Sequence, residues 1–211
     1  IAALSAVCDA HGVPLLVDNA HGAYLRFLPG GSRHPIDLGA AACCDSGHKT
    51  LPVLTGGAYL HLGPKAPVQE ESTVRNALAL FGSTSPSYLI LQSLDACNRL
   101  LSTDYPARLQ ECCDRLAALR ARLNALAAVQ GTALPLALDG PAREPMKLTL
   151  DAAALGLTGQ ALADHLRQNG MECEYADPRY LVLMFTPENP AEDIARLEAA
   201  LAELCAPVSY T

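Results

Sequence analysis

Two ionisable residues, Asp18 and Lys49, follow short apolar runs that are typical of buried strands. Asp18 ends the run at 13–18, and Lys49 comes shortly after the run at 40–45. Open α/β sheets bind ligands beyond the carboxyl ends of their strands, so both residues are expected at such a place. There a lysine amine can form a Schiff base with a carbonyl compound, and a carboxylate needs a partner charge. Taken singly, Asp18 has the alternative role of a turn or helix cap, and Lys49 that of a loop cation.

The elements that must position these residues form a first region with strands and helices. An opening helix ends near 11–12, and the strands predicted after it are 13–18, 40–45 and 57–62. Helices follow at about 70–81, 86–102 and 107–128. In the last of these, apolar residues recur at steps of three and four and form one stripe. Its charged residues fall off that stripe: Arg108, Asp114, Arg115, Arg120 and Arg122.

A second region of alternating pattern follows the long helix. It contains predicted strands at 146–150 and 180–185 and helices at 158–169 and 190–204, with Thr158 as the N-cap of the first helix. The sequence therefore predicts two domains, 1–130 with the long connecting helix and 131–211. The fold class is α/β, with part of a mostly parallel sheet flanked by helices and then a small α+β domain.

Composition excludes several classes of protein. Of the 211 residues, 50% are hydrophobic and 18% are charged, which suits a globular core rather than disorder. No apolar run approaches the length of about 18–20 residues that a membrane span needs, and no secretory signal is visible. The net charge of −7 offers no basic surface for nucleic acid. We therefore expect a cytoplasmic protein that binds neither membranes nor nucleic acid.

Eight cysteines are present, with vicinal pairs at 43–44 and 112–113 and no CxxC spacing. Zinc sites use ligand spacings that this set does not offer, so no metal site is predicted. We expect reduced, buried thiols in a reducing compartment.

Four segments in order along the chain resemble the ornithine/lysine/arginine decarboxylase family in its shorter, bacterial form. This family belongs to the fold-type I pyridoxal-phosphate enzymes. A lone His-Lys dipeptide would carry no weight, whereas four ordered blocks that span nearly the whole chain are specific. The blocks are VDNAHGAYLRF at 17–27, DSGHKTLPVLTGGAYLHL at 45–62, STSPSYLILQSLDA at 83–96 and GLTGQALADHLRQNGMECE at 156–174.

The resemblance implies a role for each matched position. Lys49 is expected to form the Schiff base with the aldehyde of pyridoxal 5'-phosphate, and Asp18 to pair with the pyridinium nitrogen so that the ring accepts electrons. Once released by substrate, Lys49 is a candidate proton carrier, together with His21. The cofactor-binding set that the resemblance implies is Lys49, Asp18, Ala20, His21, Ser46 and His48, with Ala20 and His21 near the ring and Ser46 and His48 at the phosphate. For both histidines a satisfied structural role is the alternative.

The segment before the helix at 86–102 carries a further implication. In the resembled family it lies near the dimer interface, so Ser83, Thr84 and Ser85 are expected to reach the cofactor phosphate of a partner subunit. The active site would then be shared in a homodimer or larger homo-oligomer. The alternative is a plain capping segment for the helix.

The expected reaction is decarboxylation of a basic amino acid, namely arginine, lysine or ornithine. An aminotransferase or another lyase of the same fold is the alternative, because Asp18 and Lys49 serve all of these chemistries. The family carries a further segment before its VD-x-AH strand, and a strand such as 13–18 expects neighbours on both sides. We therefore expect an incomplete record of a longer protein with an exposed sheet edge, or else a catalytically incompetent relative.

Overall fold

The computed structural model describes residues 1–28, 30, 32–129, 134–140 and 143–205. Its contacts divide the chain into unit 1, Ile1–Leu109, and unit 2, Gln110–Thr211, which are described separately below. The predicted domain boundary at 130/131 lies outside the described residues, and the division into domains 1–130 and 131–211 stays a prediction. Among the described helices, none is both long and apolar enough to cross a membrane.

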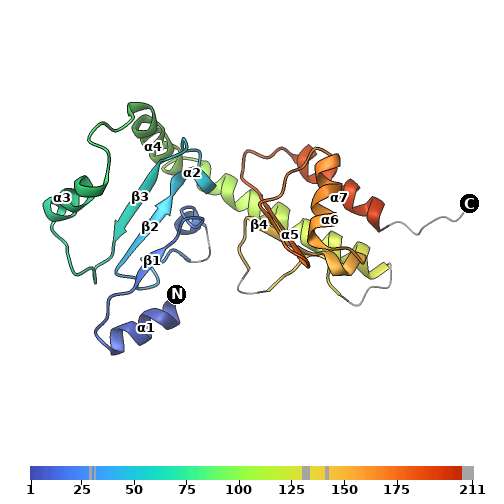
Figure 1. The fold of residues 1–211 in the computed structure, drawn as a ribbon, viewed down its shortest axis with the longest axis horizontal. Helices are drawn as coiled ribbons and strands as arrows, with labels where there is room; N and C mark the ends of the chain where they lie inside the picture. Colours follow the sequence, from blue (N-terminus) through green and yellow to red (C-terminus); the bar gives the residue numbers. More distant parts are fainter. Residues whose placement is uncertain (29, 31, 130–133, 141–142, 206–211) are drawn as a thin grey trace, which may run out of the picture. The chain divides into compact units, whose positions relative to one another are not determined.

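Unit 1 is built around a three-stranded sheet (Figure 1). Its strands are β1 (Leu16–Asp18), β2 (Ala42–Ser46) and β3 (Ala58–Leu62), with β2 in the middle. β1 pairs with β2 in parallel, whereas β3 pairs with β2 antiparallel, so this portion of the sheet is mixed. The remaining elements are α1 (Ala2–Ala10), the 3₁₀ turn η1 (Leu25–Phe27), α2 (Gly47–Thr50), α3 (Glu71–Phe81) and α4 (Tyr88–Leu101).

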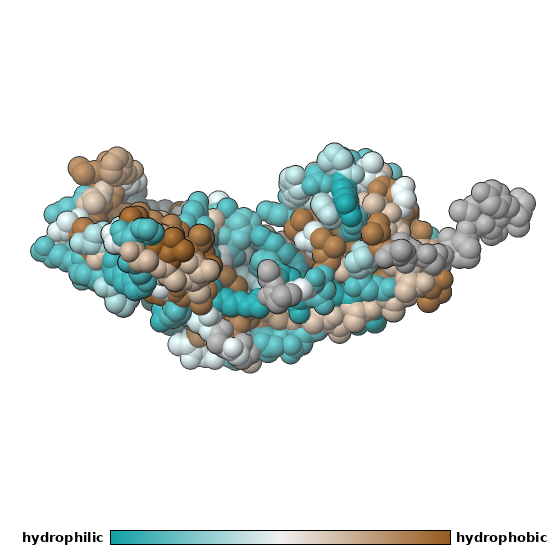
Figure 2. Space-filling view, turned by 90° about the horizontal axis from the view of Figure 1, so that it is seen from below, coloured by the Kyte–Doolittle hydropathy of each residue, from teal (hydrophilic) through white to brown (hydrophobic). Residues whose placement is uncertain are grey.

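β1 is an edge strand among the described residues, which place a neighbour on one side of it only. The expectation of a strand buried on both faces is wrong, since Leu16 is 66% exposed. Hydrophobic side chains also reach the surface on α1, where Leu4 and Val7 are exposed, and Figure 2 shows such brown areas in this part of the chain. The sequence predicts an exposed sheet edge because it offers few strands, and β1 forms such an edge among the described residues.

Unit 2 combines an antiparallel sheet with helices. Its strands occur in the order β4-β6-β5, and both pairs are antiparallel. This agrees with the predicted α+β pattern, although β5 is too short to have been predicted from periodicity. The elements are α5 (Tyr105–Val129, of which unit 2 contains the part from Gln110 on), β4 (Lys147–Asp151), the 3₁₀ turn η2 (Ala152–Leu155), α6 (Gly159–Gln168), β5 (Tyr175–Ala176), β6 (Tyr180–Met184) and α7 (Ala191–Leu204).

The core of unit 2 confirms the apolar stripe of α5. Leu116, Leu119 and Leu123 are fully buried and pack in one cluster with side chains from the sheet, α6 and α7. Thr158 also caps α6 as predicted, since its Oγ1 accepts a hydrogen bond of 3.2 Å from the backbone N–H of Ala161. Packing of this stripe is therefore the main link between α5 and the sheet of its unit.

Arg120 departs from the prediction, because it is buried although it lies off the apolar stripe. Its guanidinium donates hydrogen bonds to the backbone carbonyls of Glu144, Pro145 and Lys147, at the start of β4. Burial lowers the pKa of Arg120 from its usual value. The side chain thus satisfies backbone acceptors that helix and sheet leave open.

All eight cysteines are free thiols, as predicted. Four of them are buried, and the vicinal pair on β2 is split between environments: Cys43 is buried and Cys44 is exposed. This split follows from the alternation of side chains along a strand. The expectation of buried thiols therefore holds for half of the set.

Candidate active site

The carboxyl ends of β1 and β2 bring the two predicted ligand-binding segments together. Asp18 is the last residue of β1 and pairs in register with Cys44 of β2, and the backbone N–H of Asn19 continues this pairing with a bond of 2.9 Å to the Cys44 carbonyl. Because the strands are parallel, the turn after Asp18 and the turn that carries Lys49 leave the same edge of the sheet. The Asp18 carboxylate is exposed at this edge.

Lys49 lies on the single-turn helix α2, directly after β2. Its Nζ is 3.4 Å from Nε2 of His21, which comes from the turn after β1, and both side chains are half-buried. The predicted pair of Lys49 and His21 is therefore brought together, across 28 residues of sequence. No ion pair joins Lys49 to a carboxylate within the described parts of the chain, so its nitrogen faces an imidazole instead.

The turn after Asp18 is held by three local contacts. Oδ1 of Asp18 accepts a 3.2 Å hydrogen bond from the N–H of Ala20, and the N–H of Gly22 bonds to the carbonyl of Asn19 at 2.8 Å. The side chain of Asn19 donates from Nδ2 to Oδ1 of Asp45 at 2.7 Å, which ties this turn to β2. Ala20 is half-buried between these anchors, at the position expected beside a cofactor ring.

Asp45 forms the centre of a buried polar network that the sequence prediction missed. Its Oδ2 accepts from Nε2 of His34 at 2.9 Å and from Nε2 of His61 at 3.0 Å, in addition to the bond from Asn19. Burial alone would raise the pKa of Asp45, but these hydrogen bonds outweigh it and hold the pKa far below the usual range. Asp45 therefore stays ionised and fixes two histidines and the turn after β1.

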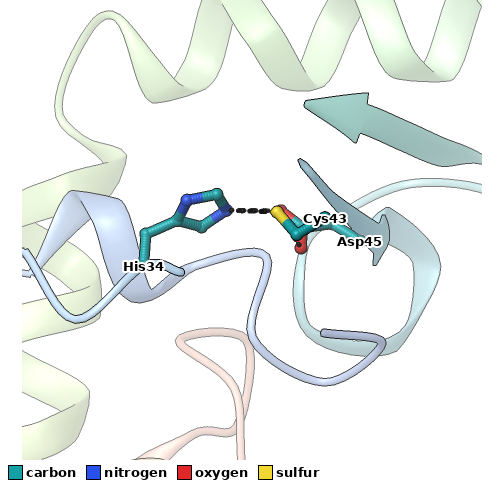
Figure 3. Close-up of side chains that lie close together, drawn as sticks. All are labelled: His34, Cys43 and Asp45. Carbon is teal, nitrogen blue, oxygen red and sulfur yellow. Dashed lines mark hydrogen bonds and ion pairs between the residues drawn. The ribbon is translucent and has the colours of Figure 1, made fainter. Parts of the chain in front are cut away.

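A sequence signal for this network existed in the strand pattern. Residues two apart on a strand share a face, so Cys43 and Asp45 point the same way, and His61 is the register partner of Cys43 across β2 and β3. His34 could not be placed in this way, because it lies in the loop before β2, and Figure 3 shows its ring directed at Cys43 and Asp45.

The two predicted phosphate ligands differ in their surroundings. Ser46 ends β2 and occupies the N-cap position of α2, half-buried. His48 donates from Nδ1 to the backbone carbonyl of Gly57 at 3.1 Å, so in its neutral form Nε2 is an acceptor. A donor role of His48 toward a phosphate therefore requires the imidazolium form, whereas the bond to Gly57 matches the structural alternative.

The segment Ser83–Ser85 lies apart from these residues in the chain, in the connection between α3 and α4. Its residues are exposed, and the N–H of Ser85 bonds to Oγ of Ser83 at 3.1 Å. α4 begins at Tyr88 without a side-chain cap, which leaves the capping alternative without support.

The chain is similar to known proteins in sequence and in fold. The model of the Orn/Lys/Arg decarboxylase major domain matches residues 2–141. The chain belongs to this family. The arginine decarboxylase of Bacillus subtilis (strain 168) is 30% identical over 200 residues, covering 93% of this chain and 40% of the relative. The chain thus spans about two fifths of the length of the curated relatives that it matches.

Solved structures show the fold of this family member. The constitutive lysine decarboxylase of E. coli matches with a TM-score of 0.70 at 18% identity, over 90% of this chain and 33% of that one. An alanine–glyoxylate aminotransferase from Nostoc sp. matches with a TM-score of 0.69 at 17% identity, over 96% of this chain and 56% of that one. The predicted fold class, part of the fold that the fold-type I pyridoxal-phosphate enzymes share, is therefore confirmed.

Proposed function

We propose that the protein uses pyridoxal 5'-phosphate to decarboxylate a basic amino acid, namely arginine, lysine or ornithine. The observation that carries the proposal is the approach of Lys49 Nζ to His21 Nε2, at 3.4 Å, beside the strand end that presents Asp18. Family membership and the arginine decarboxylase relative support the reaction class. When bound, the cofactor supplies a carbonyl group for the lysine and a ring that accepts the electrons left when CO2 departs.

Lys49 holds the cofactor in this proposal and moves a proton after substrate displaces it. Its neighbour His21 lies within hydrogen-bond distance of Nζ and can orient the amine of Lys49. The same contact lets either group return a proton to the substrate carbon after CO2 has left. Both side chains are half-buried, so this exchange takes place in partial shelter from water.

Asp18 and the residues after β2 orient the cofactor. Asp18 would hold the ring nitrogen of the cofactor, and its exposure at the end of β1 leaves the carboxylate accessible for this role. Ala20 lies next to it in the turn. Ser46 offers a hydroxyl donor to the phosphate, and His48 offers a second donor when it is protonated.

A homodimer or larger homo-oligomer with shared sites is part of the proposal. Ser83, Thr84 and Ser85 are exposed and carry hydroxyls, which suits contact with the cofactor phosphate of a second subunit. Sedimentation of the protein with cofactor should give a dimer or larger assembly, and Ser83→Ala with Ser85→Ala should weaken cofactor binding. A fully active monomer would contradict this part.

The test begins with the absorbance spectrum of the purified protein mixed with pyridoxal phosphate, before and after borohydride. We expect a Schiff-base band that borohydride removes, and its loss in Lys49→Ala. Lys65→Ala is the matched control, because Lys65 is a surface lysine paired with Asp9. A band that persists in Lys49→Ala would refute the assignment of this lysine.

Product analysis then separates the reactions that share this site. A decarboxylase releases CO2 and a diamine or agmatine from lysine, ornithine or arginine, whereas an aminotransferase releases an oxo acid. Asp18→Ala should lower turnover by orders of magnitude without loss of fold, since it removes the partner of the ring nitrogen. Cofactor binding without turnover of any basic amino acid would favour the catalytically incompetent alternative.

A further inference from the structure

Four side chains of metal-binding types meet on one face of the unit 1 sheet, outside the set assigned to the cofactor. Cys43 and Asp45 lie two residues apart on β2, and His61 is the register partner of Cys43 on β3. His34 approaches them from the loop that precedes β2 (Figure 3). Thiolate, imidazole and carboxylate are the three ligand types that zinc uses in proteins.

The distances between the ligand atoms suit a single small ion. His34 Nε2 is 2.9 Å from Asp45 Oδ2, and Cys43 Sγ is 3.7 Å from His34 Nε2 and 3.8 Å from Asp45 Oδ1. His61 Nε2 is 3.0 Å from Asp45 Oδ2. Ligand atoms around a tetrahedral zinc ion lie about 3.3–3.6 Å apart, given bond lengths of about 2.0–2.3 Å. The ligand atoms of His34, Cys43 and Asp45 all lie within 4.8 Å of one another, so small shifts would place these three around one ion. His61 lies outside this group and contacts it through Asp45.

The burial and the charges of these side chains also favour a bound metal ion. Cys43, His34 and Asp45 are almost fully buried, whereas His61 is one-third exposed and gives the ion a route of entry. One thiolate, one carboxylate and one neutral imidazole balance a divalent cation to zero net charge, which is the most favourable arrangement in a buried place. On binding, the Cys43 thiol releases its proton to solvent as the sulfur–metal bond forms.

We propose that His34, Cys43 and Asp45 bind one divalent transition-metal ion, with Zn²⁺ as the natural occupant. Three protein ligands leave the fourth position of a tetrahedral zinc ion to water. The site joins β2 to the loop at His34, and His61 of β3 lies beside it, in contact with Asp45. Asn19, which donates to the second oxygen of Asp45, orients that ligand from outside the coordination sphere. The proposal is independent of the proposed decarboxylase activity.

The experiment is a titration of chelator-treated, cofactor-free protein with Co²⁺ and then Zn²⁺. We expect one equivalent of Co²⁺, with a cobalt–thiolate charge-transfer band that Zn²⁺ abolishes by displacement. Cys43→Ala should lose the band, and Cys44→Ala is the matched control, because its thiol is adjacent in sequence but exposed on the other face. Asn19→Ala should bind Co²⁺ about 10–100-fold more weakly.

Two further measurements show whether a lost signal comes from a misfolded variant and whether the metal binds elsewhere on the protein. The wild-type protein and Cys44→Ala should both unfold at a higher temperature with Zn²⁺ than with chelator. Lys49→Ala should retain the Co²⁺ band, since the metal and cofactor sites are separate. Substoichiometric binding, a band that survives Cys43→Ala, or a melting temperature insensitive to Zn²⁺ would overturn the proposal and leave a metal-free hydrogen-bond network.

Discussion

Gly22 lies where any side chain would collide with an anchor of the turn that carries Asp18. A Cβ at position 22 would stand 2.1 Å from Oδ1 of Asn19 and 2.6 Å from its Cγ and Nδ2. The Asn19 side chain cannot swing aside freely, because Nδ2 is held at 2.7 Å by the buried carboxylate of Asp45. Gly22→Ala should therefore break the bond between Asn19 and Asp45.

The size of this effect follows from the bond that is lost. A hydrogen bond to a charged group contributes about 1.5–3 kcal/mol, so Gly22→Ala should lower the free energy of unfolding by about that amount. The backbone of Gly22 is not in the left-handed region, so strain from a changed φ adds nothing. Since each 1.4 kcal/mol is about tenfold in an equilibrium constant, cofactor affinity should fall roughly 10–150-fold if the turn must be intact for binding.

A double-mutant cycle tests this reasoning. Unfolding in urea is measured for Gly22→Ala, Asn19→Ala and the double variant. Each single change should cost about 1.5–3 kcal/mol. The double change should cost about the same as Asn19→Ala alone, because Asn19→Ala already removes both the side chain that a Cβ at position 22 would meet and its bond to Asp45. Additive costs would refute the claim that Gly22 acts through Asn19.

Three further outcomes are expected in unit 2. The Arg179 guanidinium holds the pKa of the buried Asp151 below its usual value. The stabilisation from this ion pair is therefore present above pH ~4 and is lost as the pH falls through the folded-state pKa. In Asp151→Asn, the free energy of unfolding measured in urea from pH 7 to pH 2 should fall less steeply on the acid side. Gly159→Ala should lower the free energy of unfolding by about 1–3 kcal/mol despite its better helix propensity, because the new Cβ would lie 2.3 Å from two backbone oxygens. Gly170→Ala should cost about 1 kcal/mol, because its Cβ would lie in open space at φ +71°. A larger cost for Gly170→Ala than for Gly159→Ala in urea unfolding would contradict this reasoning. Leu119→Ala should cost about 2–5 kcal/mol in the same assay, and a cost below 1 kcal/mol would be inconsistent with its full burial.

The elements of the fold were predictable where periodicity alone decides them. The stripe of α5 could be read because a helix that packs on one side repeats its apolar residues at three and four. Thr158 could be assigned as a cap because its hydroxyl precedes an apolar run. Burial was harder to predict, because the Leu16 run is typical of a buried strand but lies at an edge among the described residues.

The candidate site could be predicted from the resemblance to the decarboxylase family, and less well from the pattern of residues alone. The matching blocks predict that Lys49 and His21 share one site, and the structure brings them together. Asp45 lies in one of these blocks, but the sequence predicts no role for it, because its network with Asn19, His34 and His61 joins residues from four separate places in the chain. Pairing at that range depends on register and loop conformation, which a single sequence does not reveal.

The antiparallel pairing of β2 with β3 has a consequence for the order in which the site assembles. Lys49 lies inside the hairpin that these strands form, so its turn depends on contacts between residues close in the sequence. Asp18 joins only when β1 adds to β2 across a longer stretch of chain, which carries a larger entropy of loop closure. During folding we therefore expect the lysine turn to form first and the carboxylate to arrive afterwards. Amide hydrogen exchange during refolding would show this as protection of β3 ahead of β1.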